Sequence, residues 1–500
     1  MKGKSALLAS VAALALVASV DAGYAAKKTS DATSTPPPVA QPTGPTTAEL
    51  AARIQALEEA LEASEVKTQD DHTRLSTLEQ NFNYAKWTFD NGRPTITSGD
   101  GRFSMIFRVR FQSDFAAFMQ DDPAAASNTA QYKDLGTGMV VRRAHLGVQG
   151  FAFKDFWYEF RYNMGGSDAE SAGLSLARVS YVGIPHVRIN AGVIEPAVTF
   201  EGTFSSAQLP FMERPEIDNI FTDSFGGADG RRGIEFVYQN AGVFKADDNL
   251  VFVAAYTGQA TGSSQGHANG GDEYGTQALG RLSYRLWNDG PNNLVFGSSF
   301  AYAFDQRSGL RFRDRPQIRV NGDRLIDANV SGAREGVAWT LDGSFNYENF
   351  WVGGEWANFT AIVPGAATAA QYNPSFSGWF VEGSWILTGE TKGYTVTAQN
   401  NEIGGWTGPK VANPFSLDGD SWGAWELVLR YSDTNLNDYS GPTKYFGGEE
   451  KIINAGLNWY LNNQVRLGTY YQYVDVDKLS GSTQIGQTFS VIGMRLQFTN

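Results

Sequence analysis

The chain has 500 residues, 55 of them glycine, no cysteine, and a formal net charge of −13 at pH 7. Without cysteine there can be no disulfide bonds and no thiolate metal sites. The acidic balance argues against nucleic acid as a partner. No segment after residue 25 has the roughly 18 consecutive apolar residues of a membrane-spanning helix.

The N-terminus has the pattern of an export signal. Lys2 and Lys4 precede an apolar stretch over residues 6–20, and Gly23 and Ala25 occupy the −3 and −1 positions of a cleavage site. We therefore expect residues 1–25 to be a signal peptide that is removed after Ala25.

Two segments of different character follow the signal. Residues 26–47 are rich in proline, threonine and serine and predict a disordered linker. Residues 48–82 predict a coiled coil, because ten positions follow the a/d spacing of heptads. These positions are Leu50, Ile54, Leu57, Leu61, Ser64, Thr68, Asp71, Leu75, Leu78 and Phe82. A single amphipathic helix packed on the rest of the protein is the alternative.

From about residue 102 onward, segments of roughly ten residues alternate apolar and polar side chains, as in transmembrane β-barrels. We predict an all-β fold for residues 83–500, a sixteen-stranded antiparallel transmembrane β-barrel with the coiled-coil helix before it. An even number of strands is expected of such barrels, and sixteen leave an aqueous lumen. The predicted strands are 102–118, 139–153, 155–164, 174–183, 187–194, 231–240, 249–258, 275–287, 293–304, 336–348, 350–360, 378–388, 422–433, 451–461, 463–476 and 486–498.

The connections between these strands mostly alternate between tight turns and long loops, as expected for the periplasmic and extracellular ends of a barrel. Residues 389–421 are the exception, because the strand count places this long connection on the side of the short turns. Either that turn is long or it contains a further hairpin.

Period-2 alternation predicts which side chains face the lumen. The inward cations are nearly all arginines, whose fork suits phosphate and carboxylate. They concentrate in the first half of the barrel: Arg108, Arg110, Arg143, Arg161, Arg178, Arg231, Arg281 and Arg285. The inward acids are Glu235, Asp342, Glu355, Glu382 and Glu426. One wall would then be positive and the opposite wall negative. Alternatively, the arginines only hold a constriction loop in place.

Two long loops carry opposite charge. Residues 195–230 contain seven acidic residues and Arg214 before the sixth predicted strand, whereas residues 305–335 contain seven arginines and five acids. A basic mouth would concentrate anions, and an acidic constriction would oppose them.

Several motifs resemble the phosphate-selective porin O/P family, and the resemblance extends over almost the whole mature chain. They are WTFDNGRPTI, VRRAHLGVQG, FMERPE, RRGIEFVYQ, WGAWELVLRYS, GLNWYLNNQVRLGTYYQYV and MRLQF. The resemblance implies a trimeric porin whose arginine-lined lumen passes phosphate or related anions. The positions that match are Arg142, Arg143, Arg214, Arg231 and Arg232, so Arg214 joins the predicted anion path.

The sequence thus predicts an outer-membrane porin for small anionic solutes, surrounded by outer-membrane lipid and assembled as a homotrimer. A non-selective diffusion porin is one alternative. A structural barrel whose coiled coil contacts the periplasm or cell wall is another. No nucleophile elbow, Walker A, HExxH or Rossmann motif is present, so we expect no enzyme, cofactor or metal site.

Overall fold

The structure is a computed structural model that describes residues 45–90, 92–121, 133–166, 172–227, 229–261, 275–365, 372–396 and 403–500. The predicted signal peptide and nearly all of the predicted linker lie outside the described residues. The chain divides into two compact units, which meet in sequence between Thr77 and Leu78. Within the described part of the chain, no helix is both long enough and apolar enough to span a membrane.

Helix α2 (Thr47–Asn83) coincides with the predicted coiled-coil segment. A capping box starts it: the Glu49 amide donates to Thr46 Oγ1 (3.3 Å), and the Thr46 amide donates to Glu49 Oε2 (3.0 Å). The apolar heptad positions from Leu50 to Leu78 are exposed on the single chain, among them Leu57 and Leu61. The helix is therefore confirmed, and its pairing into a coiled coil remains a prediction.

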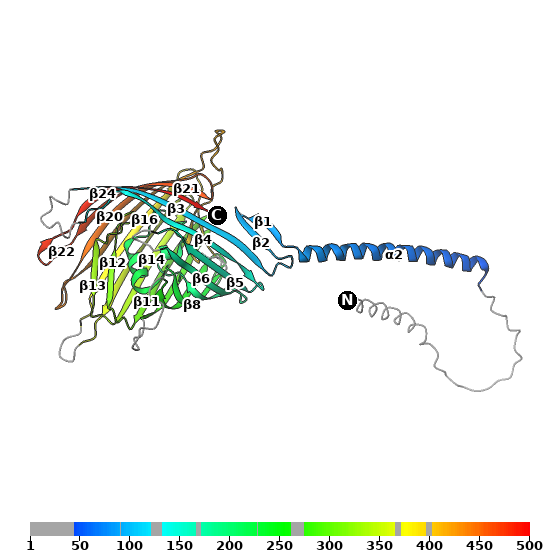
Figure 1. Cartoon of the computed structure of the whole chain (residues 1–500), viewed down its shortest axis with the longest axis horizontal. Helices are drawn as coiled ribbons and strands as arrows, with labels where there is room; N and C mark the ends of the chain where they lie inside the picture. Colours follow the sequence, from blue (N-terminus) through cyan, green and yellow to red (C-terminus); the bar gives the residue numbers. More distant parts are fainter. Residues whose placement is uncertain are drawn as a thin grey trace, which may run out of the picture. The chain divides into compact units, whose positions relative to one another are not determined.

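Sixteen antiparallel strands form a closed barrel (Figure 1). They are β3 (Ser104–Gln120), β4 (Gly138–Ala152), β5 (Phe156–Asn163), β6 (Gly173–Tyr181), β7 (Val187–Ile194), β8 (Arg231–Ala241), β9 (Asn249–Ala260), β10 (Thr276–Asp289), β11 (Asn292–Phe304), β14 (Glu335–Tyr347), β15 (Phe350–Ile362), β16 (Ser375–Ile386), β19 (Ala424–Asp438), β20 (Tyr445–Tyr460), β21 (Val465–Asp477) and β24 (Thr488–Thr499). The last strand closes on the first, with Phe498 opposite Phe111. The predicted fold is confirmed.

The shorter elements lie between or beside these strands. A hairpin of β1 (Lys86–Asp90) and β2 (Arg93–Thr97) extends the sheet at the start of β3. The others are η2 (Glu201–Thr203), α3 (Glu216–Phe225), β12 (Leu310–Asp314), β13 (Ile326–Val330), β17 (Lys392–Tyr394), β18 (Trp406–Pro409), β22 (Leu479–Ser480) and β23 (Thr483–Gln484).

Alternation along each strand separates the two faces of the barrel. In β19, Glu426, Val428 and Arg430 are buried inside, whereas Leu427 and Leu429 are exposed outside. The same period puts apolar side chains on the outer face of the other strands and polar ones on the inner face, the arrangement of a barrel in lipid.

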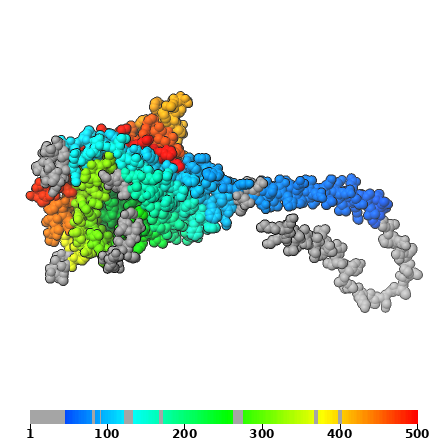
Figure 2. Space-filling model, in the orientation of Figure 1, coloured from blue at the N-terminus to red at the C-terminus, as the bar shows by residue number. Residues whose placement is uncertain are grey.

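The connection between β16 and β19 is long and contains the hairpin of β17 and β18, which forms a sheet separate from the barrel. Trp406 of this hairpin is buried and donates from Nε1 to Ser344 Oγ of β14 at 2.9 Å. The hairpin therefore lies in the lumen, at the end of the barrel where β3 begins. The following residues reach the outside of the wall, and Figure 2 shows a gold-orange segment of this region standing out from it.

Candidate functional site

Loop 195–230 folds into the lumen and packs on the wall formed by β14 to β16. Phe200 stacks on Trp351, with ring centroids 6.0 Å apart, and Phe225 lies 6.1 Å from Phe312 and 6.3 Å from Phe359. All five rings are buried. This aromatic core fixes the loop on one side of the lumen.

The acids predicted on that wall lie beneath the loops and bind them or neighbouring cations. Glu355 accepts the Phe200 amide (3.1 Å), Asp342 binds Arg281 (2.7 Å), and Glu426 binds Lys392 (2.6 Å). Their carboxylates are all buried. The strands therefore carry the predicted inward acids, but these acids are covered and do not face the open lumen.

Arg430 of β19 is the centre of this buried network. Its Nη2 lies 2.6 Å from both Glu201 of the loop and Glu382 of β16, and its guanidinium lies 4.1 Å from the centroid of Phe211. A buried guanidinium needs such partners because an unpaired charge inside the barrel would be very costly. Arg430 thus joins the loop to the wall.

The open space lies on the opposite side, against the first strands of the barrel. This cavity has a volume of about 570 Å³ and is lined by nine arginines and five carboxylates. The arginines are Arg93, Arg108, Arg110, Arg142, Arg143, Arg161, Arg178, Arg214 and Arg319. The carboxylates are Glu159, Glu195, Glu213, Asp223 and Asp229. The lining therefore has a formal excess of positive charge.

Six of the nine residues predicted to form the anion path line this cavity: Arg108, Arg110, Arg143, Arg161, Arg178 and Arg214. The other three are inward-facing but lie elsewhere. Arg281 is bound to Asp342, and Arg285 donates to Asn293 Oδ1 (3.2 Å) and lies over the Tyr394 ring.

Arg231 binds the end of helix α3 and is not part of the cavity lining. Its Nη2 donates to the carbonyls of Thr222 (2.9 Å) and Asp223 (3.2 Å), close to Gly226, where the helix stops with φ of 87°. The last carbonyls of a helix have no partner within the helix, and a basic side chain satisfies them.

A β-bulge places two adjacent arginines on the same side of β4. Gln112 pairs with Arg143 and Ser113 pairs with Val141, which leaves Arg142 as the extra residue. Arg142 donates from Nε (2.9 Å) and Nη2 (3.0 Å) to the two carboxylate oxygens of Glu213, and Arg143 Nη1 donates to Glu213 at 3.2 Å. Strict alternation would point only one of the two arginines inward.

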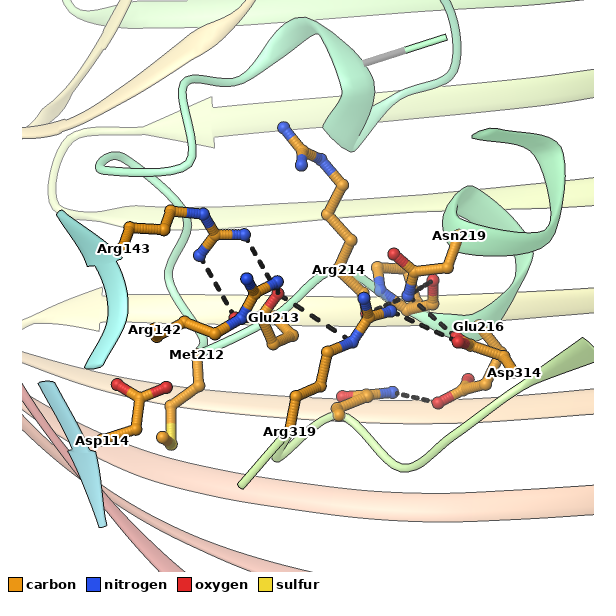
Figure 3. A network of polar contacts seen from close by, with 12 residues as sticks. Asp114, Arg142, Arg143, Met212, Glu213, Arg214, Glu216, Asn219, Asp314 and Arg319 are labelled. Atoms are coloured by element: carbon orange, nitrogen blue, oxygen red, sulfur yellow. Dashed lines mark hydrogen bonds and ion pairs between the residues drawn. The ribbon is translucent and has the colours of Figure 1, made fainter. Parts of the chain in front are cut away.

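Glu213 is the loop residue on which these arginines converge. Figure 3 shows Arg142, Arg143 and Arg319 directed at its carboxylate, and Arg495 Nη2 reaches it at 2.9 Å. Burial raises the pKa of Glu213, but the four guanidinium groups outweigh burial and hold this pKa well below its usual range. Glu213 is thus ionised and neutralises part of the arginine cluster.

Arg110 ties the cavity wall to the tip of the loop. Its Nη1 donates to Ser206 Oγ (2.6 Å) and its Nη2 to Ser205 Oγ (2.8 Å). Both partners are neutral, so these bonds fix the side chain without cancelling its charge.

Two other cavity arginines have acidic partners. Arg161 binds Glu195 at 2.5 Å, and Arg178 binds Glu159 at 2.9 Å. The Glu195 carboxylate is partly exposed to the cavity. These two glutamates therefore reduce the positive potential of the path without closing it.

A second basic site lies near the hairpin of β12 and β13. A pocket of about 420 Å³ is lined by five cations, Lys133, Arg311, Arg313, Arg315 and Arg324, together with Gly322 and two acids, Asp323 and Asp327. This agrees with the predicted basic character of loop 305–335. The described residues contain no group of three or more acidic, histidine or cysteine side chains that could hold a metal ion.

Comparison with known proteins assigns a family to this geometry. The chain is 24% identical to Porin O of Pseudomonas aeruginosa over 425 residues, covering 77% of this chain and 86% of that protein. An uncharacterized protein of Caulobacter vibrioides is 27% identical over 394 residues, covering 77% and 71% of the two chains. Among solved structures, an anion-selective porin from Comamonas acidovorans matches with a TM-score of 0.44 and 12% identity, covering 80% of this chain and all of that one. The model of the family "Phosphate-selective porin O and P" matches residues 107–499, and the chain belongs to this family.

Proposed function

We propose that this outer-membrane porin conducts small anionic solutes, phosphate or related anions, through the arginine-lined cavity. The observation that carries the proposal is the excess of arginines over carboxylates in the cavity lining. The inserted loops cover the acids of β14 to β19, so these acids do not cancel the positive charge of the arginines in the cavity. The path is thus positive despite the acidic chain.

The chemistry of the lining suits anions that carry several oxygen atoms. A guanidinium can donate two parallel hydrogen bonds to phosphate or carboxylate. In a narrow and partly desolvated lumen, each charge counts several times more than in bulk water. Arg110 lines the cavity beside Ser205 and Ser206, whose hydroxyls can also donate to an anion.

The basic pocket near β12 and β13 would attract anions before they enter the arginine-lined cavity. Clustered cations raise the local concentration of anions at a channel mouth. Arg311 and Arg324 are paired with Asp327 and Asp223, but the pocket keeps more cations than acids. It therefore supports collection of anions and not tight binding.

Planar bilayer recordings test this proposal through a double substitution, Arg108→Gln with Arg110→Gln. We expect its chloride-to-potassium permeability ratio to fall several-fold below that of the wild type. Arg102→Gln, an exposed arginine in a turn, is the matched control and should change nothing. If the double variant keeps wild-type selectivity, the arginines only hold the loop. Unselective conductance of the wild type would indicate a general diffusion porin, and no conductance would indicate a structural barrel.

We also propose that the porin is a homotrimer and that α2 contributes a coiled coil to it. The support is the row of exposed apolar side chains on α2 at heptad spacing, including Leu50, Ile54 and Leu57. In water such a row is normally covered by another helix.

A further inference from the structure

The connection between β16 and β19 passes from the lumen to the outer face of the barrel. Inside, Trp406 lies against Trp351 and Tyr394. After β18, the Val411 amide donates to Asn463 Oδ1 in the turn between β20 and β21, at 2.9 Å. Residues 413–423 follow this contact and lie beyond the turn. We name them the aromatic finger.

Contacts of the aromatic finger show that its base rests on the outer face. The Phe415 ring lies 5.3 Å from that of Trp459, edge to face, and Trp459 stacks on Trp425 at 5.1 Å. Trp459 Nε1 also donates to the carbonyl of Trp422 at 2.6 Å. Trp425 and Trp459 share the outward alternation of their strands with Leu427, so the finger touches the side of the barrel that faces lipid.

Two apolar side chains of the aromatic finger are uncovered. Leu417 is 91% exposed and Trp422 is 64% exposed, and the Trp422 ring lies 5.8 Å from that of Phe415. Figure 2 shows the segment projecting from the barrel wall. Exposed apolar side chains on a segment that contacts the aromatic residues of a membrane-facing wall differ from a single exposed leucine on a soluble surface.

We infer that the aromatic finger inserts into the interfacial region of the outer membrane's periplasmic leaflet and contacts phospholipid. Aromatic residues collect where acyl chains meet headgroups, and Trp425 and Trp459 lie at strand ends where this boundary is expected. The finger continues that surface outward through Trp422 and Leu417.

The charges of the finger favour lipid over a second copy of the chain. Asp418 and Asp420 are exposed beside Leu417. Two apposed tips would bring four carboxylates together, which is unfavourable. At a membrane surface the same carboxylates can stay in water at headgroup level while Leu417 enters the apolar layer.

The lack of cysteine in the chain makes a direct test possible. The full chain with Leu417→Cys is labelled with a nitroxide at this cysteine and placed in vesicles of phosphatidylethanolamine and phosphatidylglycerol. The collision rate of the nitroxide with oxygen is then compared with its collision rate with a water-soluble nickel complex. Leu429→Cys, in the middle of an outward strand face, is the lipid reference, and Ser480→Cys, exposed at the end of the short strand β22, is the water reference.

We expect an oxygen-to-nickel ratio at position 417 several-fold above that at position 480 and below that at position 429, as for a residue in the interfacial region. A ratio equal to that at position 480 would overturn the inference. Spin–spin broadening that disappears on dilution with unlabelled chains would assign the finger to a contact between copies and would overturn it as well. A difference in gel migration between unheated and heated samples confirms that each variant is folded.

Discussion

Arg142 and Glu213 form a two-pronged ion pair, with Nε–Oε1 at 2.9 Å and Nη2–Oε2 at 3.0 Å, and both side chains are buried. The pair joins a bulge in strand β4 to the loop that narrows the lumen. The bulge supplies the extra inward position, and the loop supplies the acid. The shape of the channel therefore depends on a contact that also neutralises part of its positive charge.

Removing the acid of this pair should loosen the loop. Glu213→Ala leaves Arg142, Arg143, Arg319 and Arg495 without their shared partner, and breaking a buried pair costs about 3–5 kcal/mol. We expect larger fluctuations of the open-channel current and a lower temperature of unfolding in detergent.

Glu195→Ala is the matched control for Glu213→Ala. Glu195 is also an acid paired with an arginine, Arg161, but its side chain is partly exposed. Water in the cavity screens this partly exposed pair, so its loss should cost less than that of the buried pair. Equal unfolding temperatures for the two variants would contradict the anchoring role of Glu213.

Neutralising Glu195 should instead change selectivity. Glu195→Gln removes a negative charge from the cavity lining and breaks its ion pair with Arg161. We expect the chloride-to-potassium permeability ratio to rise about two- to five-fold, since one charge in a narrow pore is worth about a kcal/mol or less after screening. Glu390→Gln changes a half-buried glutamate outside the cavity and should leave the ratio as it is.

Docking of the loop should weaken as pH rises through neutrality. Burial, with Asp314 nearby, raises the pKa of Glu216 from 4.5 to about 7, and burial raises the pKa of Asp218 from 3.8 to about 6. The docked loop thus favours the protonated acids. The stabilisation of docking by the two protonated acids is complete below their ordinary pKa values. It is lost as pH rises through about 6 for Asp218 and about 7 for Glu216.

The measurement for this pH dependence is current noise and unfolding temperature between pH 5 and pH 8. We expect noise to increase and the unfolding temperature to fall over this range. Glu216→Gln with Asp218→Asn should flatten both curves, because the amides cannot ionise. Unchanged curves in the double variant would show that other groups control the docking.

Assembly depends, in our account, on the heptad face of α2. Leu57→Ser with Leu61→Ser should shift the porin from trimer toward monomer in detergent, measured by light scattering, while the barrel stays folded. Gln55→Ser with Ala56→Ser changes two other positions on the helix and should leave the trimer intact. A monomeric wild type would refute the coiled-coil proposal.

Much of the barrel follows from the sequence because a strand in lipid has little freedom. Residues such as Leu427 and Leu429 must face outward, so a period of two fixes both the strand and its phase. Glu213 and its place in the lumen loop could be found from the FMERPE motif, although the partners of this residue could not.

The rest depends on contacts between segments that are distant in sequence. The second inward arginine, Arg142, requires a bulge that no alternation pattern records. Periodicity also places Arg281 and Arg110 on the same inner face, yet one is bound to Asp342 in a closed pair and the other lines the cavity. Which inward positions stay open is decided by how the loops pack.

The zero-current potential of the wild-type porin in a planar bilayer under a KCl gradient tests the central claim most directly. The arginine-lined cavity predicts a potential whose sign shows chloride to be more permeant than potassium. Phosphate added on one side should then reduce the chloride current. A potential of zero would contradict an anion path and indicate a general diffusion porin, and a potential of the opposite sign would mean that the carboxylates of the loop outweigh the arginines of the wall.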